Sequence, residues 1–441
     1  MTQKYLKQSW VIIIFGLLIR PGFSQSALTL EDCLQLAFQN SRMLQVADLG
    51  AEAATEQVAE ARAQLWPSVG LSGLYTRIGK ITSFTIPMGG VSRTFQFGTP
   101  NRVNLDLKLQ LPLFTWGRIN STIEMSQVGR SLAEVQRRQK KVELTDQVLR
   151  AFYAVLLNKE VVRLRQESIV RAERHLQTAQ ERFQAGVVPR LELLRAEVEL
   201  KNAQSAWSEA QRNLDKSKIF LAKLIGRDDR QVAVSGVFKF DPIRLNEEEV
   251  IAKATSARSD IQAIRLQQQM SQSQIALAKS GNKPNLFLFS GYNVVNGFDP
   301  LNPDKFVDNY NIGVQLAMPL FDGFATSHKV QQAELQQHQI RLQEQEMKDL
   351  VRLQVRQAIV TLQQAEDKIK TQEENIVLAK EALQVAERQY QDGLVSSIEV
   401  LDAQHTLSQS ELLRTQAIFN HVMTKLDLCR AMEDFGWFDL Q

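Results

Sequence analysis

The 441-residue sequence is poor in residues that interrupt or cross-link a chain, with 11 prolines, 21 glycines and 2 cysteines. The scarcity of proline and glycine outside a few clusters favours long helices over a compact α/β enzyme. The sequence also lacks a P-loop, an H-E-x-x-H zinc motif and a C-x-x-C pair. Its five histidines are not spaced i,i+4, which favours surface roles over metal ligation. We therefore expect no enzymatic activity, no cofactor and no metal site.

Long hydrophobic runs are missing after the N-terminus. The one continuous apolar run, Trp10–Ile19, is too short to span a bilayer, which needs about 20 residues. Lys4 and Lys7 precede this run and small residues follow it, so residues 1–24 are predicted to be a cleaved export signal rather than a buried helix. An exported protein without a membrane helix is secreted, periplasmic, or an outer-membrane β-barrel.

The excess of positive charge is confined to this predicted signal. Its three cations, Lys4, Lys7 and Arg20, account for the whole formal net charge of +3, so the mature chain has a net charge of 0. The basic isoelectric point therefore gives no support to a nucleic-acid partner, and none is expected. Cys33 and Cys429 would enter an oxidising compartment, which permits a disulfide without setting the distance between them.

The sequence does contain a long internal duplication. Residues 183–194 recur 207 positions later as 390–401, and Leu111–Phe114 recurs at the same offset as Met318–Phe321. Nearer the N-terminus the offset is 217. A repeated unit of about two hundred residues is too long for an ordinary solenoid repeat. The pattern indicates two copies of one helix–strand–strand–helix module.

Short amphipathic strands are predicted in each copy. Val103–Phe114 alternates strictly between apolar and polar residues, the period expected of a strand with two different faces. The predicted strands are 67–78 and 103–114 in the first copy and 284–295 and 310–321 in the second. The stretches 79–102 and 296–309 are predicted to be loops. Aromatic residues bracket these strands, which in an exported chain favours a membrane barrel over a soluble sandwich.

Very long helices separate the strands. The segments 117–185 and 324–392 are almost free of proline and glycine, and a helix of this length approaches 100 Å at about 1.5 Å per residue. Shorter helices are predicted over the remaining segments, 28–64, 189–225, 245–281 and 396–432. The predicted organisation is a signal (1–24), a first repeat (28–226), an equatorial linker (227–243), a second repeat (245–433) and a C-terminal tail (434–441).

The strand count constrains assembly. Two strands per copy give four per chain, whereas the smallest membrane barrels use eight. An open sheet edge in lipid leaves backbone groups unpaired at a cost of several kcal/mol each. A membrane location would therefore require several chains, and the strand count alone does not choose among two, three or four.

These segments resemble the TolC-type outer-membrane efflux protein family over nearly all of the mature chain. The most specific matches are the two turns around Gly186 and Gly393 and the two Pro-Leu-Phe strand ends, the first followed by Trp116-Gly117-Arg118. The resemblance implies a mainly α fold with a small β part. Long helical hairpins would form a periplasmic tunnel, and four strands per chain would enter a shared transmembrane β-barrel. It also implies a homotrimer in outer-membrane lipid, a periplasmic adaptor and an inner-membrane transporter.

The resemblance assigns roles to the two turns. Residues Gly186, Val187, Val188, Gly393, Leu394 and Val395 would form the periplasmic tip at which an adaptor docks. The alternative is that each glycine is a helix C-cap followed by an apolar contact. A basic residue is common in the family at the position of Val395, so any closing interaction that used that cation is in doubt here.

A pore constriction is implied just after the second turn. Glu399 and Asp402 correspond to acidic residues that close the family's tip, and a spacing of three places both on one helix face. Rings of carboxylates in a pore favour cations. Ser396 and Glu399 also form a capping-box pattern, so Asp402 is the better candidate for the pore. Arg195, from the first copy, could pair with Asp402.

The function implied is a passive exit duct for small molecules or polypeptides in a tripartite efflux or type I secretion system. One alternative is a periplasmic coiled-coil adaptor, which has a single long hairpin rather than two equal copies. The other is a structural coiled coil, which would not need polar residues alternating with leucines in a strand.

Overall fold

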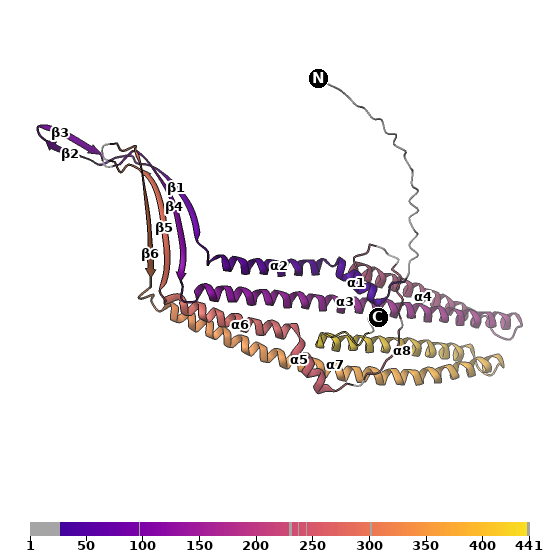
Figure 1. The fold of residues 1–441 in the computed structure, drawn as a ribbon. Helices are drawn as coiled ribbons and strands as arrows, with labels where there is room; N and C mark the ends of the chain where they lie inside the picture. Colours follow the sequence, from indigo (N-terminus) through magenta and orange to yellow (C-terminus); the bar gives the residue numbers. More distant parts are fainter. Residues whose placement is uncertain are drawn as a thin grey trace, which may run out of the picture.

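The computed structural model describes residues 27–96, 98–228, 232–236, 238–243, 245–299 and 302–438, so the predicted signal lies outside the described residues. Two long helical hairpins run in the same direction and carry one bent sheet at their common end (Figure 1). The expected fold class is confirmed: the chain is mainly α with a small β part, built from a duplicated helix–strand–strand–helix module.

The elements follow the same order in both copies. Those of the first copy are α1 (Leu30–Asn40), α2 (Arg42–Ala63), β1 (Ser68–Arg77), β2 (Ser83–Met88), β3 (Val91–Gln96), β4 (Asn101–Phe114), α3 (Arg118–Gln184) and α4 (Arg190–Leu224). Those of the second are α5 (Glu247–Ala257), α6 (Ser259–Lys279), a 3-10 turn (Ser280–Asn282), β5 (Asn285–Asn296), β6 (Phe306–Ala317), α7 (Ala325–Gln391) and α8 (Ser397–Met432).

The helices α3 and α7 are the long rods of the molecule. Each has 67 residues, which corresponds to about 100 Å. Each pairs with a return helix, α4 or α8, in an antiparallel hairpin (Figure 1). Buried alanines at heptad spacing in α4, namely Ala196, Ala203 and Ala210, allow the two helices to approach closely. Over the described ranges, none of the helices is long and apolar enough to cross a membrane.

The prediction of one continuous helix over 28–64 was wrong. The chain divides into α1 and α2 at Ser41, whose hydroxyl accepts a hydrogen bond from the Leu44 amide at 3.4 Å and so starts a new helix. The neighbouring Asn40 amide donates to the Ile225 carbonyl at 2.9 Å. This contact joins residues that are 185 positions apart in the sequence, and it fixes the bend against the end of α4.

The prediction of one helix over 245–281 was also wrong. The chain breaks at Arg258 between α5 and α6. The carboxylate of Glu433 accepts hydrogen bonds at 2.6 Å from both the backbone amide and the hydroxyl of Ser259, and thereby caps the new helix. Arg258 pairs with Asp260 at 2.5 Å. The end of α8 therefore determines where α6 begins.

The main sheet joins the two copies. Its strand order is β1-β4-β5-β6, and every neighbouring pair is antiparallel. Leu107 lies opposite Leu71 on one side and Tyr292 on the other, so the copies meet at β4 and β5. Within the described chain, the outer edges of β1 and β6 have no strand partner.

The two faces of this sheet differ sharply. One presents apolar side chains to solvent, with Leu71 74% exposed, Ile312 71% and Leu316 69%. The other is polar and internally bonded, as where Asn293 donates to Asp106 at 2.7 Å. No layer of described helices covers either face (Figure 1). Within the part of the chain that the structure describes, the apolar face is therefore left uncovered.

Two strand predictions need correction. The strand predicted at 310–321 is β6, which begins at Phe306 and ends at Ala317, because Pro319 has no N–H to continue the ladder. The predicted loop at 79–102 contains a second hairpin, formed by β2 and β3.

The hydrophobic core lies midway along the rods. Here α1, α3, the end of α4, the linker and α8 pack around fully buried residues such as Val148, Leu221 and Leu426. Leu28 is joined to the linker by backbone bonds, since its amide donates to the Ala233 carbonyl at 2.8 Å. A second cluster joins α5 and α6 to α7 and α8. The structure therefore has a packed belt from which the rods extend in both directions.

Both cysteines lie in this belt as free thiols. Cys33 on α1 and Cys429 on α8 have no exposed surface and belong to the same cluster. Burial raises the pKa of each thiol to about 12. A thiol in that state is unreactive because the thiolate is the nucleophile.

We predict that both thiols resist alkylation in the folded protein. At pH 8 a thiol of pKa about 12 is ionised to roughly one part in ten thousand, whereas a free thiol is ionised to roughly one part in ten, so iodoacetamide should react on the order of 1,000-fold more slowly than after unfolding. Mass spectrometry of timed samples measures both sites. Glu52→Cys, on the exposed surface of α2, is the labelling control. Rapid modification of Cys33 or Cys429 would contradict the burial, and loss of two hydrogens would indicate a disulfide.

Candidate functional site

The free ends of the two hairpins are tight turns of the same kind. Gly186 and Gly393 adopt φ of +72° and +76°, the left-handed conformation that favours glycine. After each glycine, the next amide donates back to the carbonyl five residues earlier, at 2.9 Å from Val187 and 2.8 Å from Leu394. These are Schellman C-caps. They end α3 and α7 and reverse the chain into the return helices.

Both turns present apolar side chains to solvent. Val187 is 62% exposed and Leu394 is 74% exposed. Val188 and Val395 are half-buried, and Val395 packs against a small cluster between α7 and α8. Each turn is therefore both a helix C-cap and a site of exposed apolar surface.

A cation from the first hairpin caps the long helix of the second. The Arg182 guanidinium, near the end of α3, donates to the backbone carbonyls of Tyr390 and, at 3.0 Å, Gln391. Its Cζ atom also lies 4.7 Å from the centre of the Tyr390 ring. The last carbonyls of a helix lack partners within that helix and carry negative partial charge. Arg182 satisfies them and fastens the two hairpins together at their ends.

A buried tyrosine adds a second link between the hairpins. Tyr390 is 3% exposed, and its hydroxyl donates to Glu192 on α4 at 3.1 Å. Burial, followed by the charge of Glu192, raises the pKa of this phenol to about 12. Tyr390 therefore remains a neutral hydrogen-bond donor at physiological pH.

A buried histidine makes the third link, which corrects the prediction that the histidines serve surface roles. His175 on α3 is 5% exposed, and its Nε2 lies 3.1 Å from the Ser397 hydroxyl at the start of α8. Burial lowers the pKa of this imidazole. His421, in the central belt, is 1% exposed and lies 3.4 Å from Glu366. Among the described residues, no group of three or more His, Cys, Asp or Glu could hold a metal ion.

The two predicted constriction residues lie on α8 just after the second turn. Glu399 is exposed and accepts a hydrogen bond from the Ser396 hydroxyl, which holds the pKa of its carboxyl below the usual range. Asp402 is exposed, with a free carboxylate within the described chain. No ion pair joins it to Arg195 in the described residues of one chain. The structure thus places the two acids close together on α8. Of the two carboxylates, only that of Glu399 accepts a hydrogen bond within the described chain.

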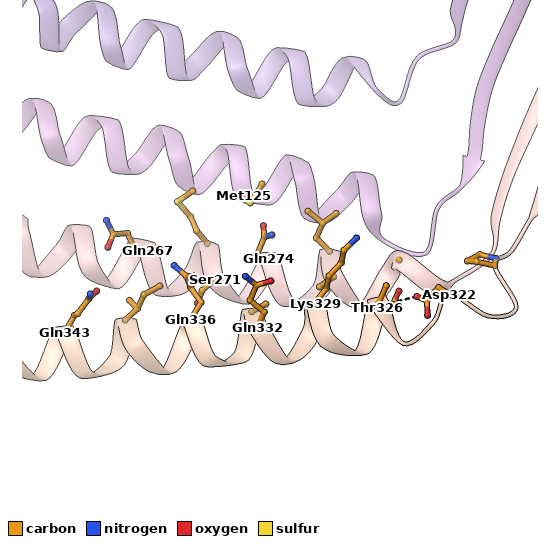
Figure 2. Close-up of a pocket in the computed structure, with 18 residues that line it drawn as sticks. Met125, Gln267, Ser271, Gln274, Asp322, Thr326, Lys329, Gln332, Gln336 and Gln343 are labelled. Atoms are coloured by element: carbon orange, nitrogen blue, oxygen red, sulfur yellow. Dashed lines mark hydrogen bonds between the residues drawn. The ribbon is translucent and has the colours of Figure 1, made fainter.

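A large pocket lies elsewhere, near the sheet. It has a volume of 1130 Å³ and opens between α3, α6 and α7 (Figure 2). Its lining combines apolar side chains with five neutral amides, namely Gln267, Gln274, Gln332, Gln336 and Gln343. The two charged residues of the lining are Asp322 and Lys329, and Asp322 already caps α7 by accepting from the Thr326 amide at 2.9 Å.

Solved structures of outer-membrane channels have the same fold. The outer membrane protein VceC from Vibrio cholerae superposes with a TM-score of 0.76 at 17% identity, covering 92% of this chain and 96% of that one. The CmeC outer membrane channel of Campylobacter jejuni gives a TM-score of 0.75 at 17% identity, covering 98% of this chain and 94% of that one. The fold of this chain is therefore the one that these solved structures share.

Sequence comparison supplies the family. The chain belongs to the outer membrane efflux protein family, whose model matches residues 33–227 and 250–417. Outer membrane protein TolC of Escherichia coli is 21% identical over 97% of this chain and 87% of its own length. The TolC of Vibrio cholerae is 26% identical over 65% of this chain and 66% of its own length.

Sequence reasoning did not find the links made by Arg182, Tyr390, Glu192 and His175. Comparing the two repeats of the sequence would have pointed to some of these residues. At an offset of 207, Tyr390 corresponds to Phe183, so only the second copy has a hydroxyl at this position. His175 corresponds to Ala382, a larger difference still. Residues that depart from an otherwise repeated pattern are candidates for contacts between the copies.

We predict that Arg182→Ala loosens the second turn. The variant loses hydrogen bonds from a charged donor, which contribute about 1.5–3 kcal/mol in proteins, and leaves the end of α7 uncapped. Hydrogen exchange at Gly393 and Leu394 should therefore accelerate by roughly 10- to 100-fold. Arg174→Ala is the matched control, because this exposed cation lies on the same helix and its side chain makes no hydrogen bond or ion pair within the described chain. Unchanged exchange in Arg182→Ala would remove its capping role.

Proposed function

We propose that this protein is the outer-membrane exit duct of a tripartite efflux or type I secretion system. The observation that carries the proposal is the main sheet, which among the described residues has an uncovered apolar face and two unpaired edges. In a bilayer, lipid would cover that face, and neighbouring copies would pair the edges. The rods would then extend from the outer membrane into the periplasm of a Gram-negative cell.

The strand arithmetic supports an oligomer, and the family supports three copies. Four strands are too few for a closed barrel, since the smallest membrane barrels have eight. The unpaired edges of β1 and β6 are antiparallel to each other when β6 of one copy meets β1 of the next. A homotrimer would close one barrel in outer-membrane lipid and gather its rods into one tunnel.

The tip is the proposed docking site for a periplasmic adaptor. Val187 and Leu394 offer exposed apolar surface at the far end of the rods, which suits helix-in-groove packing. Val188 and Val395 would support these contacts from beneath, next to Gly186 and Gly393. An inner-membrane transporter would supply energy, and transport through the duct itself would be passive, without catalysis or cofactor.

A charge placed on each face of the sheet tests the membrane assignment. Leu316→Arg puts a cation on the apolar face of β6, which costs about 2–4 kcal/mol at the middle of a bilayer. Gln315→Arg puts the same cation on the polar face, one position away. We expect outer-membrane fractionation and a detergent-stable trimer for the unmodified protein and Gln315→Arg, and loss of both for Leu316→Arg. A water-soluble monomer of the unmodified protein would overturn the proposal.

The constriction proposed at the tip predicts ion selectivity. Asp402 has a free carboxylate, so three copies would place three negative charges around a narrow pore, which favours cations. In planar bilayers, Asp402→Asn should lower the cation-to-anion permeability ratio several-fold. Glu399→Gln should have the smaller effect because Ser396 already occupies that carboxylate. Asp367→Asn, an equal charge change on α7, is the control. Unaltered selectivity in Asp402→Asn would remove this residue from the pore.

A further inference from the structure

The small hairpin formed by β2 and β3 is amphipathic. Directly paired residues share a face, so the pairs Phe84–Phe95 and Met88–Val91 place four apolar residues on one side, together with Ile86 and the residue paired with it, Arg93. This face is therefore mainly apolar. The opposite face is polar, and the hydroxyls of Thr85 and Thr94 lie 2.9 Å apart across it.

The apolar face is open to solvent along most of its length. Met88 is 62% exposed, Val91 65% and Ile86 40%. The hairpin extends beyond the end of the main sheet (Figure 1). A two-stranded hairpin standing alone in water is marginally stable at best. Met88, Val91 and Ile86 therefore offer exposed apolar surface against which another surface can pack.

Lipid is disfavoured as that partner because a polar belt separates the hairpin from the apolar face of the main sheet. The Thr99 hydroxyl donates to Asp304 at 2.7 Å. Asn296, which is 5% exposed, accepts from the Val103 amide at 2.7 Å and donates to the Asn101 carbonyl at 2.9 Å. These hydrogen bonds lie where β1 ends and β4 begins, which is also where the β2–β3 hairpin starts. The hairpin therefore begins on the far side of the polar belt from the face that lipid would cover.

The connectivity points to a second copy of the chain. The hairpin follows β1, an edge strand, and its base is fixed where the Ile78 amide donates to the Pro100 carbonyl at 2.8 Å. The end of β1, the start of β4, the end of β5 and the start of β6 all lie at this end of the sheet. When β6 of one copy pairs with β1 of the next, the start of β6 comes beside the base of the neighbour's hairpin.

The start of β6 carries exposed aromatic residues. Phe306, its first residue, is 53% exposed, and Phe298 in the preceding loop is 62% exposed. The Arg102 guanidinium lies 5.3 Å from the Phe298 ring centre and holds that ring at the rim of the sheet. The rim therefore offers an apolar surface at the place where the neighbouring hairpin emerges.

We propose that the β2–β3 hairpin is a clasp between copies. Its apolar face packs against Phe298 and Phe306 of the adjacent copy, on the side of the barrel away from the helices. The clasp rests on the proposed oligomeric duct. It adds a contact outside the strand pairing that closes the barrel, so its loss and the loss of the barrel are separable.

Cross-linking between differently tagged copies tests the clasp. One copy carries Ile86→Cys and the other Phe298→Cys, so a disulfide can form only between chains. The native cysteines are fully buried and do not compete. After oxidation of co-expressed copies in membranes, we expect a covalent heterodimer on a denaturing gel. Thr85→Cys, on the polar face of the same hairpin, should cross-link to Phe298→Cys at least tenfold less.

The remaining outcomes are distinct. A detergent-stable trimer without the Ile86–Phe298 cross-link overturns the clasp and leaves the duct standing, whereas a monomer overturns the duct as well. Equal cross-linking from Thr85→Cys and Ile86→Cys also overturns the clasp. Quenching of a fluorophore at Ile86→Cys by spin-labelled lipid identifies lipid as the partner instead. As a second measure, Met88→Asp should lower the temperature at which the trimer dissociates in detergent, while Thr85→Asp should not.

Discussion

The unpaired backbone at the two edges of the main sheet is the constraint on which the rest of the structure depends. In an apolar medium, each N–H or C=O without a partner costs several kcal/mol. A chain that places four strands in lipid cannot meet that requirement alone. In the proposed duct, copies of the chain pair at β1 and β6, and this pairing brings the rods of each copy into one ring. The arrangement of the helices in the proposed assembly would then follow from hydrogen bonding in the sheet.

The internal duplication provides the two long helical hairpins, and contacts between the two repeats of one chain hold these hairpins side by side. The packed belt around Val148, Leu221 and Leu426 joins elements from both halves of the chain. The rods leave this belt side by side. Arg171 of α3 links them to Ser408 and Glu411 of α8 along the way, and Arg182 and Tyr390 bridge the hairpins at the turns. A chain built from two similar modules therefore becomes one unit through residues in which the modules differ.

The sequence was sufficient for features that depend on local pattern. Alternation in Val103–Phe114 predicted β4, and glycines after long unbroken segments predicted the ends of α3 and α7. Features that depend on distant contacts were missed. The break at Arg258 is fixed by Glu433, and the buried state of His175 requires Ser397, more than 200 residues away. The clustering of such residues at the tip explains why the turns were predicted and their bridging contacts were not.

Because the tip lies far from the belt, a small rotation of a hairpin at the belt produces a large displacement at the tip. The return helix α4 has 35 residues, so it is about 50 Å long. A tilt of about 5° at the belt would displace its far end by roughly 4 Å, more than the length of a hydrogen bond. An aperture between the turns could thus widen by several ångströms while the side-chain packing in the belt remained intact.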